Sequence, residues 1–319
     1  MTLLSPVKQQ QAPPIAATRG RMALHSITTG KLDQPDRFLI VGQEGVGKTT
    51  LGADAPSPIF LCAEDGTAHV DVARFPEPQN FGDVLEAVQT LIDERHSFET
   101  LVVDTIDWLE PYVWQHVCAA ARKPDIESFG YGKGYVAALD EWRKLLALFD
   151  KLRAAKRMRI MLLAHAHIKA FRNPEGEDYD RFTGKLHDKA FGLIKEWADH
   201  VLFARFQVYT VEKDGRSKGI SDGARVLCTT RTAAYDAKNR ADLPPELPLS
   251  WGDLAAAIEA KKPGDPAKLE AEALALAEQL GDETTTAKTN EFLNTNRGNA
   301  AKLAHLVNRL RALVAEKGK

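Results

Sequence analysis

The sequence predicts an α/β fold with a mostly parallel sheet, helices on both faces, antiparallel strands at one edge and a small helical C-terminal domain. Short β-rich apolar runs alternate with longer helical segments from Arg37 to about Asp253, which is typical of parallel strands joined by crossover helices. A glycine-rich turn from Gly42 to Thr49 follows the first apolar run. After about Asp199 short turns join the apolar runs, which predicts hairpins.

The individual elements follow from the spacing of apolar residues. Strands are expected at residues 38–41, 58–63, 100–103 and 160–164. Helices, in which apolar residues recur every three or four positions, are expected at residues 48–53, 81–94, 108–121 and 136–155. Two further strands, at residues 201–211 and 224–230, flank a turn at Asp214-Gly215.

Composition divides the chain into four parts. Residues 1–35 are rich in Gln, Pro, Ala and Thr and are expected to form a flexible tail. The α/β core is expected at residues 36–260, and a Lys-, Pro- and Gly-containing linker at residues 261–266. The pattern of residues 267–319 predicts amphipathic helices with a basic face. Such a face indicates packing on the core or binding of a partner.

The bulk properties limit the classes of protein to consider. A chain of 319 residues with 44% hydrophobic content can bury a sizeable core. The formal net charge of −2 argues against a surface uniformly coated in positive charge. Three widely spaced cysteines lack the spacing of a zinc site or a disulfide framework. Because no apolar run is long enough for a membrane helix or a signal peptide, we expect a cytoplasmic protein without a membrane partner.

The glycine-rich turn is the strongest motif in the chain. The pattern is that of a phosphate-binding P-loop, in which glycines let backbone N–H groups surround phosphates. Lys48 is expected to reach the β and γ phosphates, and the Thr49 hydroxyl to bind Mg²⁺. We therefore expect ATP and Mg²⁺ as cofactors. ATP is favoured over GTP because no Asn-Lys-x-Asp segment for guanine occurs in the sequence. The predicted nucleotide-binding residues are Gly42, Gln43, Glu44, Gly45, Val46, Gly47, Lys48, Thr49 and Thr50.

Two carboxylates at strand ends complete the predicted catalytic site. The apolar strand Leu101–Val103 ends in Asp104, which is expected to hold Mg²⁺ beside Thr49. The preceding strand ends near Glu64, which is expected to orient and deprotonate the attacking water. The alternatives are an acidic turn for Asp104 and a solvated loop acid for Glu64. Asp107 is interpreted as a helix N-cap.

The fourth strand is expected to end in His165-Ala166-His167. A polar side chain at this position could contact the γ-phosphate and report its loss, and we interpret His165 as this sensor. Two histidines one residue apart also suggest a metal site, with Asp178, Asp180 and His187 as further candidate ligands.

The order of these elements resembles the RecA/RadA-like ATPase core, in particular phage nucleotide-binding proteins that include RecA-like single-strand annealing proteins. The likeness spans about residues 38–253 and includes the segments Phe129–Tyr135 and Ala237–Arg240. The resemblance implies that Lys238 and Arg240 reach the nucleotide of a neighbouring subunit and assist catalysis there. The alternative is an exposed basic turn. The family commonly has glutamine where this chain has His165.

The resemblance also implies two DNA-facing loops, at about residues 124–135 and 168–189. Both mix cations with aromatic residues, a composition suited to the phosphates and bases of single-stranded DNA, although acidic residues dilute the second. A solvated surface loop is the alternative. The candidate DNA-binding residues are Lys133, Lys169, Phe171, Arg172, Arg181, Phe182 and Lys185.

The function that the resemblance implies is that of an ATP-dependent, homo-oligomeric single-stranded DNA-binding protein. It would promote annealing or homologous recombination in phage DNA metabolism, in the cytoplasm of an infected bacterium, with a single-stranded DNA-binding protein as a further candidate partner. The alternative is a ring-forming helicase or translocase on the same core, which directional, ATP-dependent unwinding would distinguish. A small-molecule phosphotransferase is disfavoured because no acceptor motif is visible.

Overall fold

The computed structural model describes residues 27, 34–64, 69–213, 216–220, 223–260 and 266–317. Most of the predicted N-terminal tail and the hairpin turn expected at Asp214-Gly215 lie outside these residues. The chain divides into two compact units, one of which is Asp33–Lys262, while the other includes Pro263–Lys319. Within the described ranges, none of the helices combines the length and the apolar character needed to cross a membrane.

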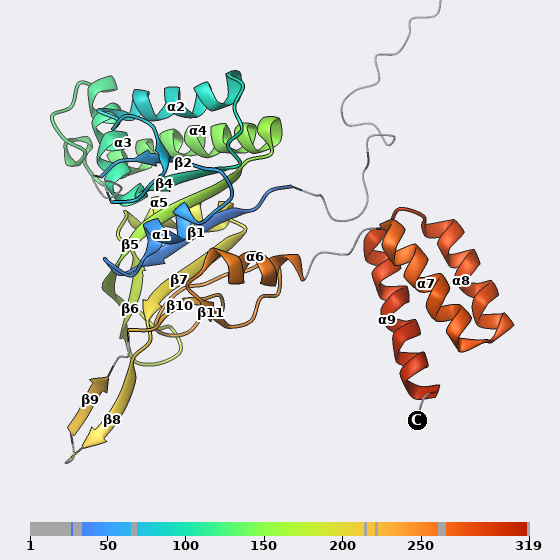
Figure 1. Ribbon diagram of the computed structural model, residues 1–319. Coiled ribbons are helices and arrows are strands. Elements are labelled where there is room, and N and C mark those ends of the chain that lie inside the picture. Colours follow the sequence, from blue (N-terminus) through green and yellow to red (C-terminus); the bar gives the residue numbers. More distant parts are fainter. Residues whose placement is uncertain are drawn as a thin grey trace, which may run out of the picture. The chain divides into compact units, whose positions relative to one another are not determined.

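The larger unit is built on one sheet, which has nine strands among the described residues (Figure 1). Eight of them follow the order β11-β10-β7-β1-β5-β4-β2-β3, and β6 pairs with β5. The strands are β1 Arg37–Gly42, β2 Pro58–Cys62, β3 Ala73–Arg74, β4 Thr100–Asp104, β5 Arg159–Phe171, β6 Tyr179–Gly184, β7 His200–Phe206, β10 Arg225–Cys228 and β11 Glu246–Pro248. A separate hairpin consists of β8 Tyr209–Lys213 and β9 Arg216–Ile220.

The pairing of the strands confirms the predicted fold class. The strands from β3 to β7 are parallel to their neighbours along the order, whereas β10 and β11 are antiparallel at one edge. Strand β1 lies between β5 and β7, so one strand separates it from β4. Because parallel strands end at the same edge, the segments after β1, β2 and β4 meet there.

Helices cover both faces of this sheet, as the sequence predicts (Figure 1). Residues of α2, α3, α4 and α5 share one hydrophobic core with the sheet, and residues of α1 and α6 share the other. In β1, Leu39 and Val41 face the first core while Phe38 and Ile40 face the second. The helices are α1 Lys48–Ala53, α2 Phe81–Asp93, α3 Ile106–Ala120, α4 Lys133–Lys156, α5 Asp188–Trp197 and α6 Trp251–Glu259, with a short 3₁₀ turn η2 at Glu127–Phe129.

Strand β5 differs from its predicted counterpart at residues 160–164. It continues to Phe171 and pairs with β6 in an antiparallel hairpin. Much of the segment expected to be a mobile DNA-facing loop is therefore regular structure. The strand expected at residues 201–211 is likewise two strands, because β7 ends at Phe206 and β8 begins at Tyr209.

The C-terminal residues form three helices with a core of their own. These are α7 Pro266–Leu280, α8 Glu283–Asn296 and α9 Ala300–Lys317. Asp282 caps α8 by accepting the Thr284 and Thr285 backbone N–H groups. Arg311 pairs with Glu272 across α9 and α7. The buried core residues are Leu269, Ala273, Leu280, Leu293, Leu303, Val307 and Leu310.

Candidate nucleotide-binding site

The predicted P-loop connects β1 to α1 at the carboxyl edge of the sheet. Two of its glycines are required by geometry. A Cβ on Gly42 would lie 2.7 Å from the Ala204 carbonyl oxygen, and Gly47 has a φ of 105°, which side chains disfavour. Val46 is buried in the core, whereas Gln43, Glu44 and Gly45 are exposed. The loop is therefore anchored at its base and open at its tip.

Lys48 is the buried cation of this loop, with only 6% of its surface exposed. Its Nζ donates to the carbonyl oxygens of Gly42 at 3.1 Å and Gln43 at 3.0 Å. Burial lowers the pKa of Lys48, and the charge of Asp104 acts in the opposite direction. Because its two partners are neutral carbonyls, the ammonium group has no anion bound directly to it among the described residues and is suited to receive phosphate.

Thr49 and Asp104 meet beside Lys48. The Thr49 hydroxyl donates to Asp104 Oδ2 at 2.8 Å, and Thr50 follows on the exposed side of α1. Asp104 is 1% exposed, and its Oδ1 has no hydrogen-bond partner among the described residues. Burial raises the pKa of Asp104. A buried carboxylate oxygen without a partner, next to a hydroxyl, suits the hard oxygen-binding ion Mg²⁺.

Glu64, His165 and Asp107 form a chain of polar groups near Asp104. Asp107 accepts both the backbone N–H and the Nδ1 hydrogen of His165, each at 2.9 Å. The opposite ring nitrogen, Nε2, lies 3.9 Å from Glu64 Oε1. Burial raises the pKa of Glu64, and the neighbouring His165 lowers it. The site thus holds a carboxylate of enhanced basicity beside an imidazole of fixed orientation.

Asp107 and His165 differ from their predicted settings. The N-cap of α3 is Thr105, and Asp107 lies in the first turn of the helix, so the interpretation of Asp107 as an N-cap is wrong. His165 lies within β5 instead of after it, where the parallel pairing with Gly42 ends and the pairing of Ala166 with Gly184 begins. The alternative metal site lacks support, because no group of three or more His, Cys, Asp or Glu suited to a metal occurs among the described residues.

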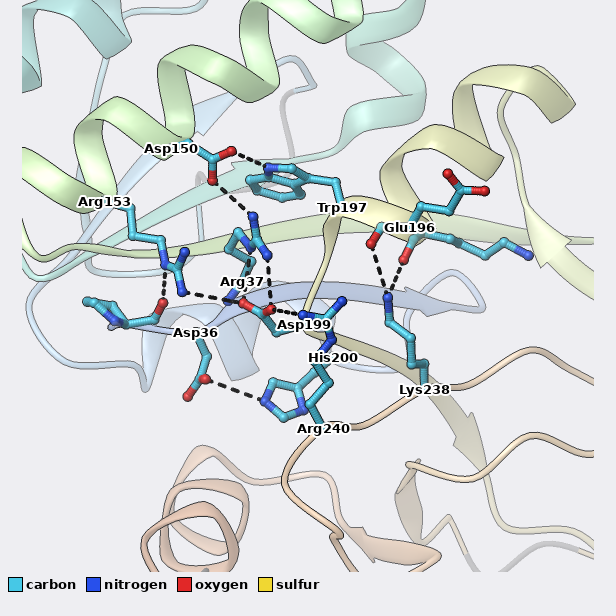
Figure 2. Close-up of polar contacts among 12 residues, drawn as sticks. Asp36, Arg37, Asp150, Arg153, Glu196, Trp197, Asp199, His200, Lys238 and Arg240 are labelled. Carbon is cyan, nitrogen blue, oxygen red and sulfur yellow. Dashed lines mark hydrogen bonds and ion pairs between the residues drawn. The ribbon is translucent and has the colours of Figure 1, made fainter. Parts of the chain in front are cut away.

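Lys238 and Arg240 lie near the opposite, amino edge of the sheet (Figure 2). Lys238 donates to the carbonyl oxygens of Lys195 and Glu196 at the end of α5, and Arg240 pairs with Asp199 at 3.2 Å. Asp199 also pairs with Arg37 at the start of β1. Because the P-loop follows the other end of this six-residue strand, about 16 Å along it, neither cation is placed at the P-loop of its own chain.

The candidate DNA-binding residues fall into two groups. Arg181 is 7% exposed and pairs with Asp236, and the Phe182 ring packs against Phe203 in the core. The remaining side chains lie wholly or partly at the surface, where Lys169 pairs with Asp188. These residues are Lys133, Lys169, Phe171, Arg172 and Lys185.

The two segments expected to face DNA are joined by aromatic contacts. Tyr135, at the start of α4, stacks on His187 with a centroid distance of 4.1 Å. Tyr131 is fully exposed and lies between Gly130 and Gly132, and all three residues have positive φ. A non-glycine residue in the left-handed region carries a conformational cost. Sequence analysis did not single out Tyr131, although its two flanking glycines are a signal for such a backbone.

Glu110 of α3 contacts the same region at His187. Its carboxylate accepts the His187 backbone N–H at 3.0 Å, and burial raises the pKa of Glu110 to about 7. Between pH 4.5 and about 7, Glu110 therefore keeps its proton in the folded chain but loses it in the unfolded chain. The free energy of unfolding should consequently fall by up to about 3 kcal/mol as the pH rises through this range. Urea unfolding across this range measures the slope.

The control for this pH dependence is Glu110→Gln, which keeps an oxygen acceptor for the His187 N–H but cannot titrate. Its stability should change less with pH than that of the natural chain. Equal slopes for the two proteins would show that Glu110 does not carry the effect.

The parallel sheet, the loop around Lys48 and the Thr49–Asp104 pair define a P-loop nucleotide-binding protein of the ATPase class. The family described as AAA domain matches residues 34–241, which is more than half of the chain, so this chain belongs to that family. Among solved structures, a crystal structure of the RadB recombinase matches with 14% identity and a TM-score of 0.37, covering 61% of this chain and 80% of that chain. No curated protein matches.

Proposed function

We propose that this protein hydrolyses ATP at the P-loop site, with Glu64 as the general base. The observation that supports this most directly is the placement of Glu64 and Asp104 at the carboxyl ends of neighbouring strands, beside the Lys48 ammonium group and the Thr49 hydroxyl. Bound Mg²⁺ would neutralise charge on the phosphates.

Each side chain has a distinct role in the proposed reaction. Glu64 accepts a proton from water as the water oxygen bonds to the γ-phosphorus, and the bond from that phosphorus to the β–γ bridging oxygen breaks to release ADP. Lys48 stabilises the negative charge that develops on the phosphates. Asp107 holds the His165 ring with Nε2 toward Glu64, so His165 positions the base and detects loss of the γ-phosphate.

We further propose that the active form is an assembly of identical chains. The support is the location of Lys238 and Arg240 away from their own P-loop, with the Arg240 side chain 59% exposed. A heterologous interface can bring such a surface against the P-loop of the next subunit. Both cations are occupied by contacts within the chain (Figure 2), so assembly would exchange those partners for phosphate oxygens.

Mixing two variants tests whether Arg240 acts across an interface. Arg240→Ala and Lys48→Ala should each be nearly inactive, Arg240→Ala by about a thousandfold. When they assemble together, about a quarter of the interfaces pair an intact Lys48 with an intact Arg240, and ATPase activity should return. A mixture no more active than its separate components, although size measurements show mixed assemblies, would contradict action in trans.

The proposed ligand of the assembly is single-stranded DNA, and the proposed role is single-strand annealing or homologous recombination in phage DNA metabolism. The surface of the β5–β6 hairpin carries Arg172 and Lys185, while Tyr131 lies just before α4 and Lys133 is the first residue of that helix. Cations paired with exposed aromatic rings suit the backbone and the unstacked bases of a single strand. The left-handed backbone that lifts Tyr131 into solvent is the kind of local strain found at binding sites.

Tyr131→Ala should weaken binding of a single-stranded oligonucleotide by about tenfold, because a base loses its stacking partner. Fluorescence anisotropy with a labelled oligonucleotide measures the affinity. Tyr131→Phe keeps the ring and should bind as the natural chain does. If Tyr131→Ala binds as tightly as Tyr131→Phe, this ring is not a stacking platform, and if the natural chain binds no single strand at low salt, the DNA proposal itself fails.

A further inference from the structure

Arg225 lies against the phosphate-binding loop, although it is 177 positions along the chain from Lys48. It is the first residue of β10 and pairs in register with Phe206, the last residue of β7. A Cβ built on Gly47 would lie 2.9 Å from Arg225 Nη1. The guanidinium group is therefore in contact distance of the loop that is shaped to bind phosphate.

The charge of Arg225 is not used elsewhere among the described residues. Its guanidinium carbon lies 5.7 Å from the centre of the Phe206 ring, and no carboxylate within the described ranges lies at ion-pair distance from it. The neighbouring Arg205, by contrast, pairs with Glu246 at 2.6 Å. Arg225 is exposed and retains donors for an anion. An exposed guanidinium beside an anion-binding loop suits a phosphate ligand.

The sheet order indicates which part of the nucleotide Arg225 would meet. Asp104 and Glu64 follow β4 and β2, which lie beyond β5 on one side of β1. Arg225 lies on the opposite side of β1, on β10, where it is level with the last residue of β7. A polyphosphate whose γ end faces Asp104 and Glu64 therefore directs its nucleoside end toward Arg225.

We propose that Arg225 binds the phosphate nearest the nucleoside, within its own subunit, as a second cation beside Lys48. This inference rests on the proposed nucleotide site. The Phe206 ring holds the guanidinium group through a cation–π contact. A cation in this place binds a group that does not react, so it contributes equally to the ground state and the transition state.

The test compares Arg225→Gln, Arg225→Lys and the natural chain in binding of ATP, ADP and inorganic tripolyphosphate, and in steady-state ATPase kinetics. Arg225→Gln should bind all three ligands about tenfold more weakly, with a similar rise in KM and little change in kcat. Arg225→Lys should recover most of the affinity. The matched control is Arg143→Gln on α4, where Arg143 is an exposed arginine paired with Asp140, and it should bind as the natural chain does.

Three results would overturn the inference. Unchanged binding in Arg225→Gln would show that the guanidinium does not touch the ligand. Weaker binding of ATP and ADP with unchanged tripolyphosphate binding would assign Arg225 to the base or the sugar. A fall in kcat without a rise in KM would make it a catalytic group. Failure of the proposed function is distinguishable, because then Lys48→Ala would bind ATP as tightly as the natural chain.

Discussion

Lys48→Ala is expected to lower ATP hydrolysis by about a thousandfold, because it removes the buried positive charge that stabilises the phosphates in the transition state. The ammonium group lies within 3.1 Å of the Gly42 carbonyl oxygen, and no carboxylate in the described part of the chain is bound directly to it. The cost of burying this charge away from water is therefore fully compensated only when phosphate binds. ADP release under saturating ATP measures the loss.

Lys144→Ala is the control for this experiment. Lys144 is an exposed lysine of α4 that pairs with Glu141 one turn away, so its removal should leave hydrolysis unchanged. The folded state of Lys48→Ala should be verified by thermal unfolding, since the substitution also removes two hydrogen bonds within the loop. A folded Lys48→Ala protein that hydrolyses ATP at the natural rate would refute the proposed site.

The parts of the site that the sequence predicts are those encoded over a few residues. The P-loop glycines, Lys48 and Thr49 follow from the chemistry of one turn. Asp104 is predicted from an apolar strand with an acidic end. The structure places its carboxylate 2.8 Å from the Thr49 hydroxyl, and its binding of Mg²⁺ stays a prediction. Such patterns are readable because each residue is placed by its immediate neighbours along the chain.

The parts that the sequence does not predict depend on register between distant segments. Asp107 accepts a hydrogen bond from His165, which lies 58 residues further along the chain. Arg225 reaches Gly47 only because β10 pairs antiparallel with β7. No local pattern specifies which residue of a strand lies opposite which. The same reason explains why Arg181 and Phe182 are not free to bind DNA, although their residue types suit it. Their partners, Asp236 and Phe203, come from distant parts of the chain.

Strand β5 illustrates how a tertiary partner overrides a local expectation. The resemblance implies a DNA-facing loop from about residue 168, in a segment that mixes cations, acids and aromatic residues. In the structure the chain pairs with β6 from Ala166 to Phe171, so backbone hydrogen bonds of the hairpin replace those that water would provide. His165 is thereby held at a fixed point of the sheet instead of at the start of a loop.

Glu64→Gln is expected to reduce hydrolysis by about a hundredfold to ten-thousandfold while leaving ATP bound, because glutamine has the same shape but cannot accept the proton of water. The rate of the natural chain should also fall as the pH decreases, since burial raises the pKa of Glu64 and protonation removes the base. Rapid-quench measurement of phosphate formation, with ATP affinity measured separately, distinguishes the chemical step from binding.

Asp107→Asn provides the sharper comparison, because it changes the partner of His165 and leaves Glu64 in place. The neutral amide still accepts one hydrogen bond but removes the Asp107 charge that helps to raise the pKa of Glu64, so hydrolysis should fall less than in Glu64→Gln and its pH dependence should shift. If Glu64→Gln hydrolyses ATP at the natural rate, another group activates the water. If Asp107→Asn retains both the natural rate and the natural pH profile, the contact at 2.9 Å between Asp107 and His165 only supports the strand, and His165 does not couple the base to the nucleotide.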